Sequence, residues 1–142
     1  STANYVAFSG KGSNASWYYG HMVNPSNTTI GSIQCTASSV SYNTSSDHRL
    51  KENVVDLTGA TDRLKQLNPS RFNFIADPET TVDGFLAHEV QAIVPEAIHG
   101  TKDEVDADGN PVYQGIDQSK LVPLLVATIQ ELEARITALE NA

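Results

Sequence analysis

The chain has 142 residues, 39% of them apolar, and a formal net charge of −8, which suits one ordinary domain or two small ones. Its single cysteine, Cys35, excludes an intrachain disulfide, and no run is apolar and long enough for membrane insertion. Residues 1–45 hold one charged side chain, Lys11, whereas residues 46–142 hold every acid and the other bases. This acidic second part argues against a nucleic-acid partner, and the charge step predicts a boundary between two structural regimes.

Residues 1–45 predict a polar, strand-forming segment. Ser, Thr, Asn and Gly supply 24 of these 45 residues, too many for the segment to close a core by itself. Aromatic and β-branched residues recur between Gly, Ser and Asn turns, which is typical of short strands. The clearest strand spans 29–36, after a turn signal at 24–27. We favour the β-rich end of an intertwined stalk over a disordered linker. Trp17, Tyr18 and Tyr19 could instead form a sugar-binding or receptor-binding surface, but packing is the commoner use of such residues.

Residues 46–115 predict a small α+β body. A helix is expected over 58–67, capped by Thr58 and stopped by Asn68-Pro69. Residues 71–75 alternate like a strand, and the Asp77-Pro78-Glu79 stretch is expected to turn. Residues 84–87 then indicate a buried strand that feeds a short helix over 88–94, closed by Pro95.

The stretch over 104–113 predicts a hairpin with an Asp-Gly turn. Its acids mimic the first half of an EF-hand loop, but the closing acid of such a loop falls on Gly115. The four histidines show no metal-ligand spacing, and one cysteine makes no zinc set. We therefore expect neither a metal site nor a cofactor.

Residues 116–142 predict a helix that starts near Val122, with Pro123 tolerated in the first turn. Apolar residues follow with spacings of three and four, which is a heptad pattern with β-branched residues at a and Leu at d. These residues, called the seam below, are Val122, Leu125, Ile129, Leu132, Ile136 and Leu139. The helix could pack on its own domain, but we prefer a short parallel coiled coil.

The number of strands in this coiled coil is contested. The β-branched a positions with Leu at d lean toward two strands. Arg135 at g and Glu140 at the following e instead look like the signature of short trimeric coiled coils, in which an interchain ion pair covers the seam. We expect three strands, supported by the body or the stalk because so short a coil is marginal alone.

Several motifs together resemble a known arrangement. They are Ser46-Asp-His-Arg-Leu-Lys-Glu-Asn-Val54, Gly84-Phe-Leu-Ala-His-Glu-Val-Gln91, Pro95-Glu-Ala97 and the helical stretch from Asp117 to Leu132. The chain resembles the C-terminal end of a phage tail spike or tail fibre that carries a self-cleaving, endosialidase-type intramolecular chaperone domain. His88 departs from the Gln expected there. Because the chain begins with Ser1 rather than Met, we expect it to be part of a longer protein.

The resemblance implies a homotrimeric fibre precursor in which residues 1–45 end the stalk and residues 46–142 form the chaperone. Carried over by position, Ser46 is the nucleophile, Lys51 is its base, and the Ser45–Ser46 bond is cut. The chaperone would assist folding of the upstream stalk in the host cytoplasm. The mature fibre would belong to the virion tail and would meet a host cell-surface receptor or glycan.

The proposed chemistry can also be argued from the residues. A serine hydroxyl needs an adjacent base, and without a convincing Ser-His-Asp set a Ser-Lys pair is the available arrangement. Lysine acts as a base only when neutral, which requires burial or a nearby positive charge. Arg49 could supply that charge or hydrogen-bond the scissile carbonyl. Ser45 and Ser46 are adjacent, and it is the resemblance, through Asp47 in the position after the serine, that selects Ser46 over Ser45. A turn between Ser46 and Lys51 would bring the two together.

Three alternatives stay open at the level of sequence. The Ser-Asp-x-Arg stretch could simply be a helix N-cap with an acid in its first turn. The chain could be a non-catalytic trimeric fibre-tip module that binds a receptor through Trp17, Tyr18 and Tyr19. A much weaker hypothesis is a hydrolase that acts on other molecules.

Overall fold

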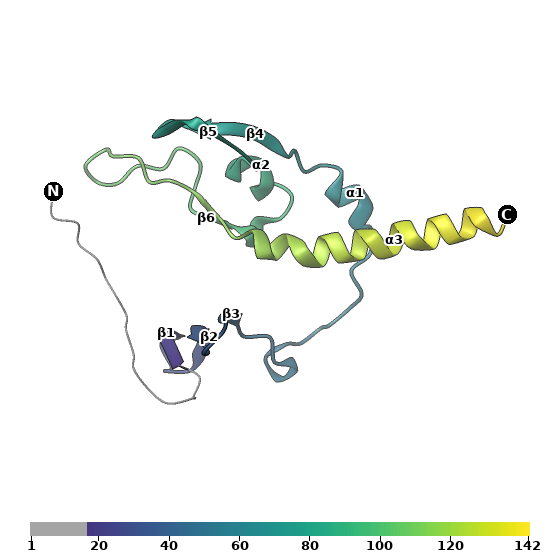
Figure 1. Cartoon of the computed structure of the whole chain (residues 1–142), viewed down its shortest axis with the longest axis horizontal. Coiled ribbons are helices and arrows are strands. Elements are labelled where there is room, and N and C mark those ends of the chain that lie inside the picture. Colours follow the sequence, from purple (N-terminus) through teal and green to yellow (C-terminus); the bar gives the residue numbers. More distant parts are fainter. Residues whose placement is uncertain (1–16) are drawn as a thin grey trace. The chain divides into compact units, whose positions relative to one another are not determined.

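The structure is a computed structural model that describes residues 17–142 (Figure 1). The chain divides into two compact units, one ending at Val54 and the other running from Val55 to Ala142. Strand-forming residues before Trp17 lie outside the described residues, as do the side chains of Trp17, Tyr18 and Tyr19. Helices and strands both occur, in agreement with the predicted α+β class. Within residues 17–142, no helix combines the length and apolar character needed to cross a membrane.

The first unit contains a three-stranded antiparallel sheet in the order β1-β2-β3, formed by β1 (Trp17–Val23), β2 (Thr29–Cys35) and β3 (Val40–Thr44). The predicted strand and the preceding turn are confirmed. Asn24 builds the turn because its side-chain Oδ1 accepts hydrogen bonds from the backbone N–H groups of Ser26 and Thr28.

This sheet buries little of its apolar surface. Among its side chains that the structure describes, only Ser32 is buried. The exposed large apolar side chains are Met22, Val23, Ile30, Val40 and Tyr42. Because burial of such side chains is the main source of folding stability, a single copy of this sheet has little to hold it together.

The second unit has one hydrophobic core that gathers short elements around a long C-terminal helix (Figure 1). The helical elements are α1 (Ala60–Leu64), α2 (Ala87–Gln91), η2 (Pro95–Ala97), η3 (Gln118–Leu121) and α3 (Val122–Glu140). The buried core residues are Ala60, Val90, Val94, Ala97, Leu121, Leu124 and Ala127. All of these elements therefore share one apolar centre, to which α3 contributes Leu124 and Ala127.

The start of α1 differs from the expectation. Thr58 does not cap the helix; the N-cap position is taken by Gly59, whose φ of 69° lies in the left-handed region that favours glycine. No capping side chain comes from within α1. The donors are instead satisfied by Glu131, a residue of α3 that is distant in sequence.

The turn predicted at 77–79 needs correction. Strand β4 (Ser70–Phe74) is confirmed, but the chain reverses at Ile75 and Ala76, and the stretch predicted to turn instead begins β5 (Asp77–Gly84). Pro78 is tolerated there because a two-stranded sheet consists only of edges, and the Pro78 carbonyl accepts a hydrogen bond from the Asn73 side chain.

The buried strand predicted at 84–87 is wrong: Gly84 is the last residue of β5, and Leu86 is exposed. Helix α2 starts at Ala87, one residue earlier than expected. α2 also ends earlier, at Gln91, because Pro95 opens the separate helical turn η2. Two short strands that the sequence did not reveal, β6 (Ile98–His99) and β7 (Gly115–Ile116), pair antiparallel to each other.

The predicted hairpin between β6 and β7 is confirmed. Val105 bridges Pro111, the Val112 N–H donates to the Glu104 carbonyl at 2.8 Å, and Gly109 takes the turn with a φ of 84°. Its Asp106 carboxylate accepts hydrogen bonds from Asn110, which hold the pKa of Asp106 below its usual value. The hydrogen bonds of the turn therefore account for Asp106.

Helix α3 begins at Val122 with Pro123 in its first turn, as predicted. One of its faces is buried against the body through Leu124, Ala127 and Thr128. All six seam residues lie on other faces and are between 40% and 78% exposed. Beyond Glu131 no residue of α3 is buried, and the helix extends past α1 (Figure 1).

Leu124 and Leu125 offer a matched test of this packing. Leu124→Ala should lower the free energy of unfolding by about 2–5 kcal/mol, because Leu124 is 2% exposed and its removal leaves a cavity. Leu125→Ala, at a side chain that is 44% exposed on the same helix, should cost less in the dilute single chain. Urea unfolding of both variants measures the difference; equal losses at every protein concentration would contradict this packing.

Candidate active site

A short turn after β3 organises the predicted cleavage residues. Asp47 is the N-cap of η1 (His48–Leu50), and its carboxylate accepts a hydrogen bond from the Arg49 backbone N–H at 2.9 Å. The backbone N–H groups of Leu50 and Lys51 donate to the carbonyls of Asp47 and His48, each at 3.1 Å. The N-cap interpretation therefore describes Asp47, one residue after Ser46, and the turn folds the chain back on itself.

The turn places Lys51 beside Ser46. Lys51 Nζ donates a hydrogen bond to Ser46 Oγ at 2.8 Å, within the range in which a proton can pass between two heavy atoms. Both side chains are exposed in the single chain. The arrangement supplies a hydroxyl and an amine in contact, which are the two groups that Ser-Lys chemistry requires.

Arg49 is engaged by Asp47 through two parallel hydrogen bonds. Arg49 Nε lies 2.9 Å from Asp47 Oδ1, and Arg49 Nη2 lies 2.7 Å from Asp47 Oδ2. These hydrogen bonds hold the pKa of Asp47 below its usual value and raise the pKa of Arg49. In this conformation the Asp47 carboxylate compensates the positive charge of Arg49, the charge that was expected to act on Lys51. The same ion pair also restrains the turn.

Ser45, on the other side of the predicted scissile bond, is attached to the sheet. Its backbone N–H donates to the Ile30 carbonyl at 3.0 Å, and its hydroxyl donates to the Thr29 carbonyl at 3.4 Å. Pairing with β2 thus ends at Ser45, and the turn begins at the next residue. Thr29 and Ile30 were not predicted as supports; the β2–β3 register, Gly31 opposite Thr44, is the signal that would have indicated them.

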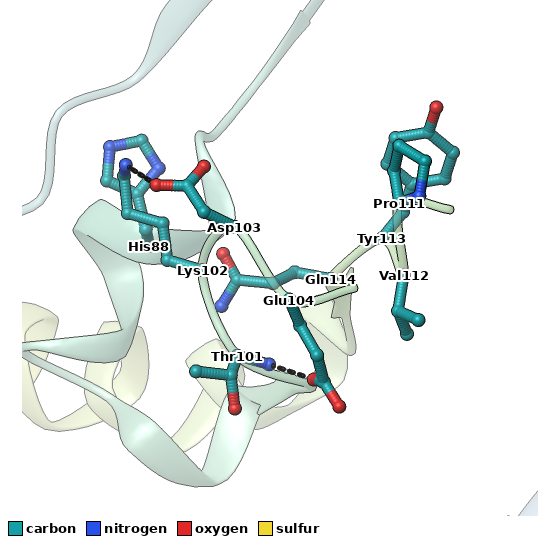
Figure 2. Close-up of a pocket in the computed structure, with 9 residues that line it drawn as sticks. All are labelled: His88, Thr101, Lys102, Asp103, Glu104, Pro111, Val112, Tyr113 and Gln114. Carbon is teal, nitrogen blue, oxygen red and sulfur yellow. Dashed lines mark hydrogen bonds and ion pairs between the residues drawn. The ribbon is translucent and has the colours of Figure 1, made fainter. Parts of the chain in front are cut away.

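A separate pocket of about 370 Å³ lies between two segments of the long hairpin (Figure 2). It is lined by His88, Thr101, Lys102, Asp103, Glu104, Pro111, Val112, Tyr113 and Gln114. Lys102 pairs with Asp103, and the Thr101 N–H donates to the Glu104 carboxylate. The lining hydroxyls of Thr101 and Tyr113 contact neither His88 nor Lys102 through a hydrogen bond. The pocket therefore lacks a nucleophile paired with a base.

Metal-ligating side chains are dispersed. Across the described part of the chain, no three His, Cys, Asp or Glu residues lie together where they could hold a metal ion. His48 lies 3.6 Å from Asp47 and is 93% exposed, His88 lines the pocket, and His99 belongs to β6. Cys35 is a half-buried free thiol.

Comparison with known families supplies a direct match. Residues 46–99 match the family model Peptidase_S74, described as chaperone of endosialidase. The predicted resemblance to an endosialidase-type chaperone domain is thereby confirmed for residues 46–99. The match begins at Ser46, the predicted nucleophile, and includes Lys51. No curated protein matches the chain.

The Asp47–Arg49 pair has a measurable consequence for titration. Because Arg49 lowers the pKa of Asp47, the ion pair should be fully formed at any pH above the ordinary pKa of an aspartate. It should break only as the pH falls through the lowered pKa, where Asp47 becomes protonated. In Arg49→Ala the Asp47 titration midpoint should rise. Carbon-detected NMR titration of the Asp47 carboxyl, in a Ser46→Ala background, makes this comparison. An unchanged midpoint would show that Arg49 does not hold Asp47 in solution.

Proposed function

We propose that the chain is an intramolecular chaperone that trimerises, assists folding of a phage tail spike or fibre, and then releases itself between Ser45 and Ser46. The contact between Lys51 Nζ and Ser46 Oγ at 2.8 Å carries this proposal, because it occurs at the start of the segment that matches the chaperone family. The released chaperone is residues 46–142. The fibre joins the virion tail, and release occurs in the host cytoplasm.

The proposed cleavage begins with neutral Lys51 accepting the Ser46 hydroxyl proton. Ser46 Oγ attacks the Ser45 carbonyl carbon, and the new C–O bond forms while backbone N–H groups stabilise the oxyanion. The C–N bond to Ser46 breaks, and its nitrogen takes the proton from Lys51 to become a free amine. Water then hydrolyses the ester to a Ser45 carboxylate and a free Ser46 hydroxyl. Direct attack by water on the Ser45 carbonyl is the alternative route to the same products.

The exposure of the pair suggests why the cut waits for assembly. In water a lysine amine is protonated at neutral pH and cannot accept a proton. Burial by neighbouring chains would favour the neutral form, since desolvation penalises the charged one. Lys51 and Ser46 are exposed in the single chain, so a trimer has room to supply this burial.

Trimerisation is supported by the division of α3 into two apolar faces. Leu124 and Ala127 are buried against the body, whereas the seam is exposed. Arg135 and Glu140 are exposed as well, and neither has an ion-pair partner within residues 17–142. A parallel three-stranded coil would cover the seam and would pair each Arg135 with a Glu140 of a neighbour. The same assembly would bury the exposed apolar side chains of the β1–β3 sheet against neighbouring chains.

Loss of either proposed catalytic group should leave an uncut trimer. Ser46→Ala removes the nucleophile, and Lys51→Met removes the base while keeping most of the length of the side chain. We expect Ser46→Ala to abolish cleavage and Lys51→Met to slow it by about 10²–10⁴-fold. Intact-mass spectrometry of the expressed chain, with Ser41→Ala and Lys65→Met as exposed controls, measures this.

The outcomes separate the competing functions. Cleavage by Lys51→Met at the normal rate would mean that the base is wrongly assigned. A wild-type chain that trimerises and stays intact would favour the non-catalytic receptor-binding module. Cleavage of a second, separately supplied Ser46→Ala chain would favour a hydrolase that acts on other molecules.

The seam gives an independent prediction. Ile129→Asp should abolish the trimer and cleavage together, because a charge would be buried in the apolar seam. Gln130→Asp, the adjacent exposed position, should change neither. Truncation before Leu132 should act like Ile129→Asp. Sedimentation equilibrium gives the assembly mass, and mass spectrometry gives the cleaved fraction. Efficient cleavage by a proven monomer would contradict the proposed coupling.

A further inference from the structure

Glu131 joins α3 to the start of α1 through three hydrogen bonds. Glu131 Oε1 accepts from the Ala60 N–H at 2.8 Å. Glu131 Oε2 accepts from the Thr61 N–H at 2.8 Å and from the Thr61 hydroxyl at 2.5 Å. The Thr61 side chain, followed by the backbone donors, lowers the pKa of Glu131 to about 2, so the carboxylate is charged at any physiological pH.

Nothing local can replace this carboxylate. Ala60 and Thr61 are 0% and 7% exposed, so water has little access to their N–H groups. Gly59, at the N-cap position, has no side chain that could accept from them. Without the Glu131 carboxylate these buried donors would lose their partners, which is the expensive way to break a hydrogen bond.

The same helical turn of α3 also carries the seam. Ile129 and Leu132, which lie two residues before and one residue after Glu131, belong to the seam. Glu131 instead bonds to α1, which lies against the middle of α3 (Figure 1). Three chains that lock their seams together would therefore fix the axis of α3, and Glu131 would fix the start of α1 to that axis.

The start of α1 is also the first anchored point after the candidate active site. Residues 51–59 are all exposed, and Ala60 is the first buried residue after Lys51. Val54 and Val55 are 80% and 85% exposed, so the intervening segment makes little contact of its own. The hydrogen bonds from Ala60 and Thr61 to Glu131 therefore fix the end of this segment that joins α1.

We propose that Glu131 is a positioning residue for self-cleavage, which ties the segment carrying Ser46 and Lys51 to the assembled seam through the start of α1. This role rests on the proposed function, because it presumes that trimerisation precedes a cut at Ser46. It adds that trimerisation alone is insufficient without the clamp.

The test compares Glu131→Gln with Glu133→Gln in the full chain. Gln keeps the shape of Glu131 but loses its charge and one acceptor oxygen. We expect Glu131→Gln to form trimers like the wild type while cleaving about tenfold more slowly per trimer. Glu133, exposed on the same helix and bonded to Thr137 only weakly at 3.4 Å, should be replaceable without effect. Sedimentation and timed intact-mass measurement give both quantities.

Three further variants distinguish positioning from general stability. Glu131→Asp, which restores the charge, should recover part of the cleavage rate. Thr61→Ala removes one of the three hydrogen bonds and should slow cleavage less; combined with Glu131→Gln it should add nothing, because both changes break the same contact. If Glu131→Gln does not fold, Thr61→Ala decides the question alone.

Two results would overturn the proposal. One is cleavage per trimer at the wild-type rate in Glu131→Gln, or in Thr61→Ala where that variant decides. The other is a loss of cleavage that only follows a loss of trimers. A wild-type trimer that never cleaves would instead refute the proposed function, so the two failures are distinct.

Discussion

The structure depends on how α3 divides its surface. Leu124, Ala127 and Thr128 bury one face against the body, and Glu131 satisfies the buried donors at the start of α1. Each short element around this core is too short to be stable by itself, so all of them rely on α3 for a packing surface. The seam remains outside the core. One helix can thus complete the fold of its own chain and still leave a second apolar face exposed.

The candidate active site is built on the opposite principle, because its geometry is almost entirely local. Two backbone hydrogen bonds and the Asp47 cap bring Lys51 back to Ser46. The hydrogen bond from the Ser45 N–H to the Ile30 carbonyl holds Ser45 in place, immediately before the Ser45–Ser46 peptide bond. Such a turn can form in an isolated chain, where the side chains of Ser46 and Lys51 are both exposed. Under the proposed function, the turn that joins Ser46 and Lys51 would already exist before assembly. Burial of the two side chains by neighbouring chains would follow, so cleavage would come after assembly.

Agreement between sequence and structure follows the range of the interactions. The β2 strand, the Asn24 turn, the Asp-Gly hairpin and the start of α3 are each set by residues within a few positions, and these predictions were correct. One error arose where the deciding partner is distant in sequence, and another arose where a neighbouring strand decides the structure. Thr58 is an ordinary capping residue, but Glu131 accepts the hydrogen bonds at the start of α1. Pro78 is typical of a turn, but here it lies in β5, where an exposed sheet edge tolerates it.

The amino-acid sequence by itself determined the boundary in charge, the heptad spacing of the seam and the motif that begins at Ser46. These are patterns of residue type along the chain, and they need no knowledge of distant contacts. Only the tertiary structure decided that the face carrying Leu124, Ala127 and Thr128 is buried in its own body, because the heptad pattern of the sequence singles out the seam alone. It also decided that Glu131, one of several acids on α3, meets buried donors. Burial depends on neighbours that lie far along the chain, which no local pattern records.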